Sequence, residues 1–268
     1  YDLKYYDDEL SIIENLHTRS DKPVSFRVAQ DVEITRRFLQ TQCTKQENSF
    51  SLYTFVRRVD EQGSSLKAHA SIVMVHGNSE NSDNFLEYAI HHALNGFQVH
   101  LMDMKGQGLA SGERHGHYKI QDHHQQIVTM LWQVDPSLPC FVQGHSMGCL
   151  DTVNLLINNP HFKVAGLVAS SPFWGLSATH NIGMVRRLVI LFLATFLEEV
   201  PINGSGSCHL LSHDKNYFLH ELVHNCKRHS YYSSGGIINS MIESCEDISV
   251  NARVYDKPTL VFMAGKDR

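Results

Sequence analysis

The sequence predicts an α/β fold in which a mostly parallel central sheet is flanked by helices and interrupted by a helical insertion. Two observations carry this prediction. Short apolar runs alternate with segments of helical periodicity up to about residue 169, and one more apolar run follows at 258–263 after a long interruption. Short apolar runs indicate strands buried on both faces, and strands that alternate with helices imply right-handed crossovers and parallel pairing.

The chain divides into four parts on this pattern. Residues 1–46 are polar and mixed, and their role is unknown; residues 47–174 carry the α/β core. Residues 175–255 contain helical patterns and loops without a clear strand, and we interpret them as an inserted cap; residues 256–268 resume the core. Strands are expected at 50–59, 71–75, 97–102, 140–143, 164–169 and 258–263, and helices at 85–94, 120–134 and 147–157.

Length and composition describe a globular chain. It has 268 residues, 42% hydrophobic and 19% charged, with a formal net charge of −5, which argues against a nucleic-acid binder. The 18 histidines are scattered without metal-binding spacing, so we expect no metal and no cofactor. The six cysteines show no paired spacing and favour free thiols in a reducing compartment, so a cytoplasmic location is expected.

The strongest chemical motif is Gly144-His145-Ser146-Met147-Gly148, which fits the G-x-S-x-G nucleophile elbow. In this motif a serine on a sharp strand-to-helix turn raises its hydroxyl above the sheet, and only glycine fits two residues before and after it. The helix that follows directs its N-terminus toward developing negative charge. Because the motif lies between an expected strand and an expected helix, we interpret Ser146 as a nucleophile.

A second motif, His76-Gly77-Asn78, follows the first buried strand. An oxyanion hole needs one backbone N–H from the residue after the nucleophile and one from a loop after an early strand. Met147 and Asn78 occupy those two places. A plain turn is the alternative for this motif, and we interpret His76 itself as structural because it precedes the elbow at a strand end.

A third motif, Ala264-Gly265-Lys266-Asp267, follows the last expected strand, where the acid of a Ser, acid, His series stands. We therefore predict that Asp267 orients a catalytic histidine, with an ordinary turn aspartate as the alternative. Every histidine precedes Asp267. The simplest explanation is a chain that is cut at its C-terminal end, just after the strand at 258–263. Because the chain begins with Tyr1 rather than Met, we expect its N-terminal end to be cut as well. The lack of a signal peptide then says little about location.

Residues 101–114, L-M-D-M-K-G-Q-G-L-A-S-G-E-R, resemble the D-x-x-G-H-G-x-S-x-G stretch of one branch of the α/β-hydrolase superfamily. This branch holds the monoacylglycerol lipases and lysophospholipases, and with them the serine aminopeptidase-type hydrolases. Gly144 to Gly148, Ser171-Pro172 and residues 258–267 match the branch in order and spacing, so the resemblance covers about 50–268 apart from the cap. It implies the α/β-hydrolase fold and a water-dependent esterase for glycerolipids with one acyl chain, and it carries Ser146 and Asp267 into their roles.

The chain also departs from the pattern of this branch. The usual H-G-x-G-E-H is here H-G-N-S-E-N, so Ser79 stands at the second glycine, and Gln107 replaces the histidine of G-H-G. These changes leave backbone amides available and bear on substrate shape more than on catalysis. Cys149 stands where a third glycine is usual. Asp103 and Asp122 match positions of the branch, and we interpret both as structural residues that hold loops near the site.

The most apolar part of the cap is residues 188–197, which are too few to span a bilayer. They form either a cap helix packed on the core or a lid that lines an acyl-chain tunnel or touches a membrane, and these interpretations are compatible. On the lid interpretation, Leu188, Leu191 and Phe192 bind the acyl chain of a lipid ester, and peripheral contact with a membrane stays open. A peptidase, a small-ester esterase or an acyltransferase of the same fold remains an alternative, as does a non-catalytic lipid-binding protein.

Overall fold

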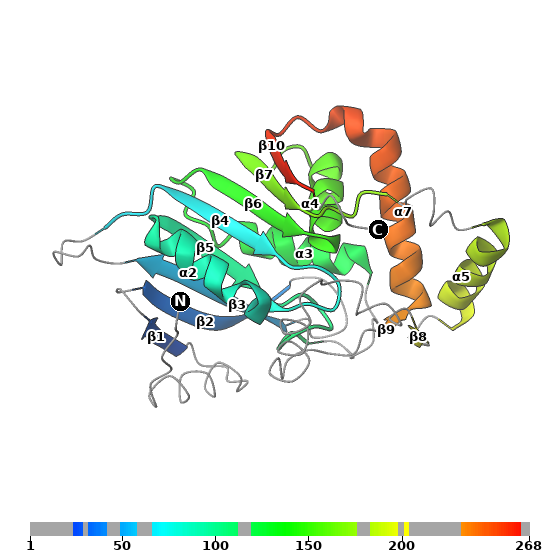
Figure 1. The fold of residues 1–268 in the computed structure, drawn as a ribbon, viewed down its shortest axis with the longest axis horizontal. Helices are drawn as coiled ribbons and strands as arrows, with labels where there is room; N and C mark the ends of the chain where they lie inside the picture. Colours follow the sequence, from blue (N-terminus) through cyan, green and yellow to red (C-terminus); the bar gives the residue numbers. More distant parts are fainter. Residues whose placement is uncertain are drawn as a thin grey trace.

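The computed structural model describes residues 24–28, 32–41, 49–57, 66–111, 119–175, 183–197, 201–203 and 232–263. Its central feature is an eight-stranded sheet in the order β1-β2-β3-β5-β4-β6-β7-β10 (Figure 1). The strands of this sheet are β1 (Val24–Val28), β2 (Val32–Gln40), β3 (Ser49–Arg57), β4 (Ala70–Val75), β5 (Phe97–Met102), β6 (Cys140–His145), β7 (Gly166–Ser170) and β10 (Thr259–Phe262).

The second half of the sheet is parallel. Strands β5, β4, β6, β7 and β10 pair in parallel, whereas β1, β2 and β3 form an antiparallel extension that joins β5. The helices that connect or flank the strands are η1 (Ser82–Phe85), α2 (Leu86–Leu94), α3 (Ile120–Leu131), α4 (Met147–Asn158), α5 (Met184–Phe196), α7 (Gly235–Asn251) and η4 (Ala252–Val254). The predicted α/β-hydrolase architecture, a largely parallel sheet with flanking helices, is confirmed.

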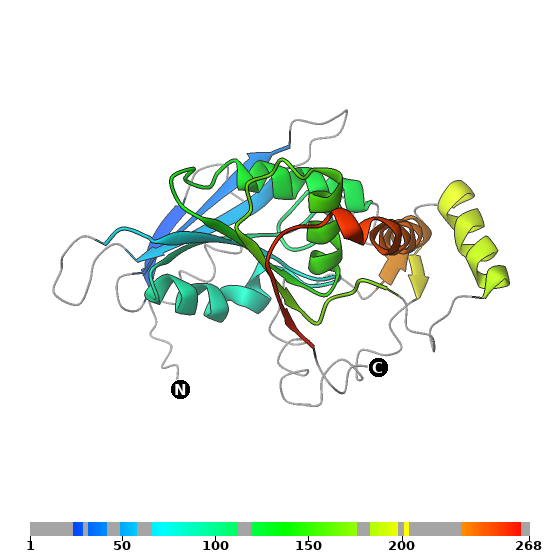
Figure 2. The ribbon, with the colours of Figure 1, turned by 90° about the horizontal axis from the view of Figure 1, so that it is seen from above.

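Helices cover both faces of the sheet, so the core has two layers (Figure 2). On one face α2 packs against the sheet, with Ala89 and Ala93 in one apolar cluster. On the other face α3, α4 and α7 pack together, and their apolar residues join a second cluster. Strand β4 contributes alternate residues to the two clusters, which explains why all six of its residues are buried and why its sequence is a continuous apolar run.

Two strands precede the first strand that the sequence analysis expected. Strand β2 pairs with β3 over its whole length, and Val32 and Ile34 alternate with polar residues in the two-residue period of a strand. This signal is visible in the sequence, although Arg36 interrupts it. The buried Arg36 lies 5.5 Å from the ring centre of Phe38. Apart from 24–28 and 32–41, residues 1–46 lie outside the described residues.

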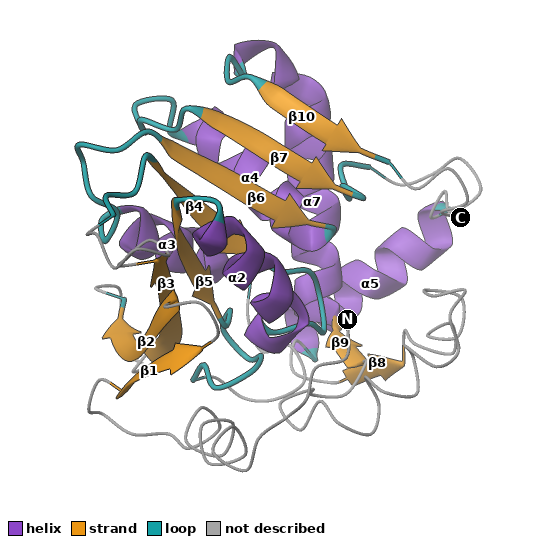
Figure 3. Ribbon diagram, turned by 60° about the vertical axis from the view of Figure 1, so that its left-hand side comes forward, coloured by secondary structure: helices purple, strands orange, loops and turns teal. Residues whose placement is uncertain are grey.

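The segment between β7 and β10, here called the insert (residues 175–255), carries α5, α7 and a short antiparallel pair. That pair joins β8 (Pro201–Asn203) to β9 (Tyr232–Ser234), so the expectation of an insert without strands was wrong. Three-residue strands are too short for a periodic pattern to show. Helix α7 packs on α4 and contributes Ile237, Cys245 and Ile248 to the core. Helix α5 packs on α7 (Figure 3) and lies at the end of the molecule in the view of Figure 1.

Candidate active site

The turn between β6 and α4 holds Ser146 in an unusual backbone conformation. Its φ is 49° and its ψ is −116°, and a positive φ is uncommon for a residue with a side chain. The turn is fixed by three backbone hydrogen bonds: the Ser146 N–H donates to Ser170, and the Ser146 carbonyl accepts from Cys149 and Phe173. The serine is half-buried, so its side chain stands on a rigid turn within reach of solvent.

The two glycines of the motif are required by close backbone contacts. A Cβ on Gly144 would lie 2.8 Å from the Cys149 nitrogen, and a Cβ on Gly148 would lie 2.3 Å from the Val75 carbonyl oxygen. Helix α4 therefore begins directly against the end of β4. Because the first amides of a helix have no partner within the helix, the Met147 N–H lies at a terminus suited to an anion.

The turn after β4 lies beside the elbow. A Cβ on Gly77 would lie 3.1 Å from the Ser146 Cβ, so the two turns are in direct contact. The Glu80 carboxylate accepts the Gly77 N–H at 2.7 Å and approaches Nε2 of His145 at 3.6 Å. Glu80 therefore connects the turn after β4 to the turn that carries Ser146.

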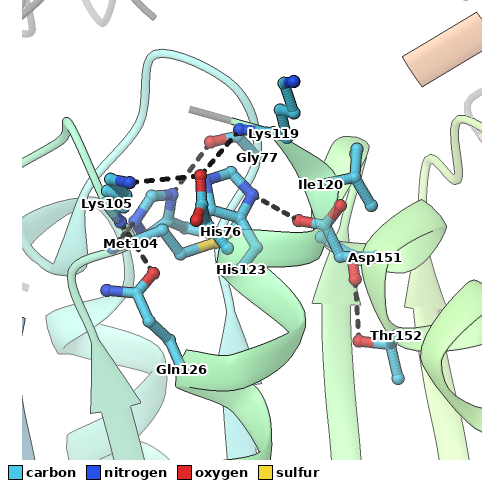
Figure 4. A network of polar contacts seen from close by, with 12 residues as sticks. His76, Gly77, Met104, Lys105, Lys119, Ile120, His123, Gln126, Asp151 and Thr152 are labelled. Atoms are coloured by element: carbon cyan, nitrogen blue, oxygen red, sulfur yellow. Dashed lines mark hydrogen bonds and ion pairs between the residues drawn. The ribbon is translucent and has the colours of Figure 1, made fainter. Parts of the chain in front are cut away.

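His76 is buried and both of its ring nitrogens are occupied. Nδ1 donates to the Gly77 carbonyl at 2.8 Å, and Nε2 accepts from the Met104 N–H at 3.0 Å (Figure 4). These partners fix the neutral tautomer, and burial lowers the pKa of His76 below its usual value. The imidazole thus has no lone pair available for a substrate, in keeping with the structural role expected of it.

Asp103, at the end of β5, gathers three segments of chain. Its carboxylate accepts from the Ser51 hydroxyl at 2.6 Å, from the Ser82 N–H at 2.8 Å and from the Leu109 N–H at 2.9 Å. Gly108 is packed directly on this carboxylate, at a φ of 57°. Asp103 is fully buried and holds loops together, which is the structural role that its position in the sequence suggested.

A polar network continues from this edge of the sheet into α3 and α4 (Figure 4). Asp122 accepts from the Lys119 N–H at 3.0 Å and forms an ion pair with Lys105 at 3.2 Å, so it also ties a loop to a helix. Deeper in the core, His123 and Asp151 form a pair at 2.9 Å that is fully excluded from solvent. This pair connects α3 to the helix that begins at the elbow.

Cys149 lies on the first turn of α4, where the family pattern has glycine. Its thiol is fully buried and contacts the Ser170 carbonyl oxygen at 3.7 Å. Burial raises the pKa of this thiol to about 12, so the sulfur stays protonated, the form in which a cysteine is a poor nucleophile.

The structure places three of the proposed catalytic residues together and leaves one outside. Ser146, Met147 and Asn78 lie on two adjoining turns, whereas Asp267 lies outside the described residues. Strand β10 nevertheless ends at the same edge of the sheet, since Phe262 is level with Ser170 and Ser170 is level with His145. The chain that follows β10 therefore starts at the edge that carries the elbow.

The three residues proposed to bind an acyl chain lie on α5 and are exposed to solvent. The exposed fractions are 59% for Leu188, 47% for Leu191 and 56% for Phe192. The other large exposed apolar residues at this helix are Met184, Val185, Val189, Phe196 and Leu197. Within the described ranges, no helix is both long and apolar enough to cross a membrane.

The sheet order, the strained serine between β6 and α4 and the adjoining turn after β4 define an α/β-hydrolase. Within that class, a family model described as serine aminopeptidase, S33, matches residues 66–268, and the chain belongs to this family.

Relatives and solved structures agree with this placement. The chain is 24% identical over 229 residues to an uncharacterized abhydrolase domain-containing protein of Dictyostelium discoideum, with 84% of the chain and 23% of that protein covered. It is 29% identical over 114 residues to the phospholipase YtpA of Bacillus subtilis, with 42% of the chain and 44% of that protein covered. The chain thus spans less than half the length of either relative.

Two solved structures with the same fold are a monoacylglycerol lipase from Paleococcus ferrophilus and a soluble variant of the monoglyceride lipase from Saccharomyces cerevisiae. The first has a TM-score of 0.65 at 22% identity, with 73% of each chain covered. The second has a TM-score of 0.68 at 19% identity, with 85% of this chain and 80% of that chain covered. At these identities, the likeness concerns the fold.

Two residues of the site were missed by sequence reasoning. Glu80 lies in the H-G-N-S-E-N stretch, and an acidic side chain three residues after the turn glycine favours a hydrogen bond from the amide of that glycine. Ser233 accepts a hydrogen bond from the Asn78 side chain, and the two residues are 155 positions apart in the chain. No local pattern in the sequence marks such a contact.

Proposed function

We propose that the protein is a serine hydrolase that cleaves carboxylic ester bonds in lipids with one acyl chain, of the monoacylglycerol or lysophospholipid type. The observation that carries this proposal is the conformation of Ser146, at φ 49° between β6 and α4, with no room for a side chain at Gly144 or Gly148. A strained residue costs on the order of 1–3 kcal/mol and clusters at functional sites. Here the strain raises a hydroxyl above the sheet edge.

The proposed reaction proceeds through an acyl-enzyme. Ser146 Oγ attacks the ester carbonyl while a histidine from outside the described residues takes its proton, and Asp267 orients that histidine. The amides of Met147 and Asn78 stabilise the oxyanion, and one such donor is worth roughly 10²–10³ in kcat. The histidine then gives its proton to the leaving alcohol. Water, deprotonated by the same histidine, releases the fatty acid and restores Ser146.

Helix α5 supports the choice of a lipid substrate. It exposes Leu188, Leu191 and Phe192 in place of the charges that usually cover a surface helix. On its other side, Arg187 forms an ion pair with Glu246 of α7 at 3.0 Å, which helps hold α5 on α7. We infer that the exposed face contacts acyl chains, either of the substrate or at the surface of a membrane.

The family description favours a second candidate, an aminopeptidase. A free amine would need an unpaired acidic side chain near the site, and the three acidic residues of α7 are engaged. Glu243 accepts from Asn239, Glu246 binds Arg187, and Asp247 accepts from Asn154, Asn158 and Asn251. The ester substrate is therefore the stronger proposal. A non-catalytic lipid-binding protein remains the candidate from another class.

The test is labelling of the full-length protein with a fluorophosphonate probe, with Ser146→Ala as the control. We expect labelling that Ser146→Ala abolishes, followed by hydrolysis of a monoacylglycerol or a lysophospholipid well above that of an amino-acid p-nitroanilide. Faster turnover of the anilide would favour the peptidase. If the folded protein binds lipid but is not labelled by the probe, the hypothesis of a non-catalytic lipid-binding protein is correct.

A further inference from the structure

A side-chain contact joins the turn that carries Asn78 to the insert. Nδ2 of Asn78 donates to Oγ of Ser233 at 3.1 Å. Ser233 lies on β9, has 8% of its surface exposed and directly precedes Ser234, the N-cap of α7. The contact therefore joins a turn of the core to the end of a helix that arrives much later in the chain.

The turn itself is strained at the next residue. Ser79 has a φ of 61°, a conformation that glycine adopts readily and serine does not. The family pattern has glycine at this position, so this chain keeps the turn but lacks the residue that suits it. The backbone bond across the turn, from the Glu80 N–H to the Gly77 carbonyl, is long at 3.4 Å. Additional contacts are needed to hold such a turn in one conformation.

The other side of the contact is firmly anchored. The Ser234 hydroxyl accepts from the Ile237 N–H at 3.3 Å, and Ile237 is fully buried in the core cluster. A Cβ on Gly235 would lie 3.0 Å from the Leu193 Cβ of α5, so this end of α7 is packed from that side as well. Ser233 is therefore a fixed point against which Asn78 is held.

We propose that Ser233 is a positioning residue for the oxyanion hole, which it orients through the Asn78 side chain. By holding Asn78, it keeps the backbone amide of that residue directed at the substrate oxygen, and it compensates for the serine at position 79. This inference rests on the proposed function, because it assigns Ser233 a part in the same acyl-transfer step. It requires that the hydroxyl act on turnover more than on binding of substrate.

The experiment measures kcat and KM on a soluble ester, and the rate of fluorophosphonate labelling, in the full-length protein. We expect Ser233→Ala to lower kcat and the labelling rate about tenfold, part of the roughly 10²–10³ lost when an oxyanion donor is removed, with KM within about twofold. Ser233→Thr keeps the hydroxyl and should restore most of the rate. Ser249→Ala, an exposed serine at the other end of α7, is the matched control and should change neither value.

Two further variants test the physical reason. Asn78→Ala keeps the backbone amide but removes the side-chain donor, so it should match Ser233→Ala, and the double variant should be no slower than either single one. Ser79→Gly relieves the strain of the turn, so the effect of Ser233→Ala should fall to about threefold or less in that background. Thermal unfolding of each variant verifies that the rates refer to folded protein.

The outcomes separate this inference from the function on which it rests. If the wild type is labelled and Ser233→Ala reacts at the wild-type rate, the role of Ser233 is overturned while the proposed function stands. The same holds if Ser233→Thr fails to restore the rate, or if Ser79→Gly leaves the effect of Ser233→Ala unchanged. A wild type that is neither labelled nor active overturns the proposed function and this inference together.

Discussion

At the scale of single residues, the site depends on where side chains are absent. Gly148 lets the first turn of α4 approach the carbonyl groups of Val75 and His76, and Gly144 lets β6 turn back on Cys149. The sequence shows these two glycines directly, because their spacing around Ser146 is fixed by the turn. The positive φ of Ser79 is not evident from the serine itself, and only the glycine that the related pattern has at this position points to it.

A buried histidine makes the stability of the fold depend on pH. His100 on β5 is 1% exposed, and burial lowers its pKa to about 4. The unfolded chain binds a proton at this residue near its ordinary pKa of about 6.5, whereas the folded chain does not. The contribution of His100 to the free energy of unfolding is therefore fully present above pH 6.5. It is lost as pH falls from 6.5 toward 4, by up to about 3 kcal/mol.

The measurement is urea unfolding of the wild type and His100→Gln between pH 7 and pH 5. We expect the wild type to lose stability more steeply as pH falls, by up to about 1.4 kcal/mol per pH unit relative to the variant. Some dependence of stability on pH remains in both proteins, because burial also lowers the pKa values of His76, His92 and His124. Parallel slopes for the two proteins would contradict the assignment to His100.

At the scale of elements, the predicted strands and helices of the core agree with the structure to within a few residues. The agreement is best where burial on both faces forces a continuous apolar run, as in β4, or where a motif marks a boundary, as at Ser146. It fails for β8 and β9, whose pairing depends on contact between distant segments. It also fails for β2, where the alternation that Val32 and Ile34 begin is visible in the sequence but is interrupted by the buried Arg36.

Asp103 shows how one side chain holds several elements in register. It binds β3, η1 and the loop after β5 through three short hydrogen bonds. In Asp103→Asn, one of these donors would face an amide NH₂, so we expect a loss of about 2–3 kcal/mol in the free energy of unfolding. Asp256→Asn, at an exposed position, is the control. A change of stability no larger than that of the control would show that Asp103 is dispensable for the fold.

At the scale of the whole molecule, the sequence predicts the class of fold and the edge of the sheet that carries the chemistry, but not how the insert meets that edge. The elbow and the turn after β4 follow neighbouring strands, so their meeting is a consequence of parallel pairing. The contact of Ser233 with Asn78 follows instead from the packing of α7 on α4. That packing depends on shape complementarity between distant residues, which no periodic pattern records.

Burial differs sharply between the two ends of the molecule. Every residue of α4 from Met147 to Ile157 is buried, whereas α5 exposes most of its apolar residues and packs on α7. In hydrogen–deuterium exchange, the amides of β4, β6 and α4 should therefore exchange slowest and those of α5 much faster, because α5 opens without disturbing the sheet. Equal protection of α4 and α5 would contradict this.

On the proposed function, this gradient in burial separates two rates, that of substrate exchange and that of the chemical step. The turn that carries the proposed nucleophile, Ser146, begins helix α4, which is buried from Met147 to Ile157. We expect this helix to open only with global unfolding, so the proposed geometry of attack should stay constant on the timescale of turnover. The helix proposed to meet the acyl chain, α5, is largely exposed, and we expect it to open more readily than the sheet. We therefore expect changes in sequence at α5 to alter how fast substrate enters and product leaves, without altering the chemical step that follows.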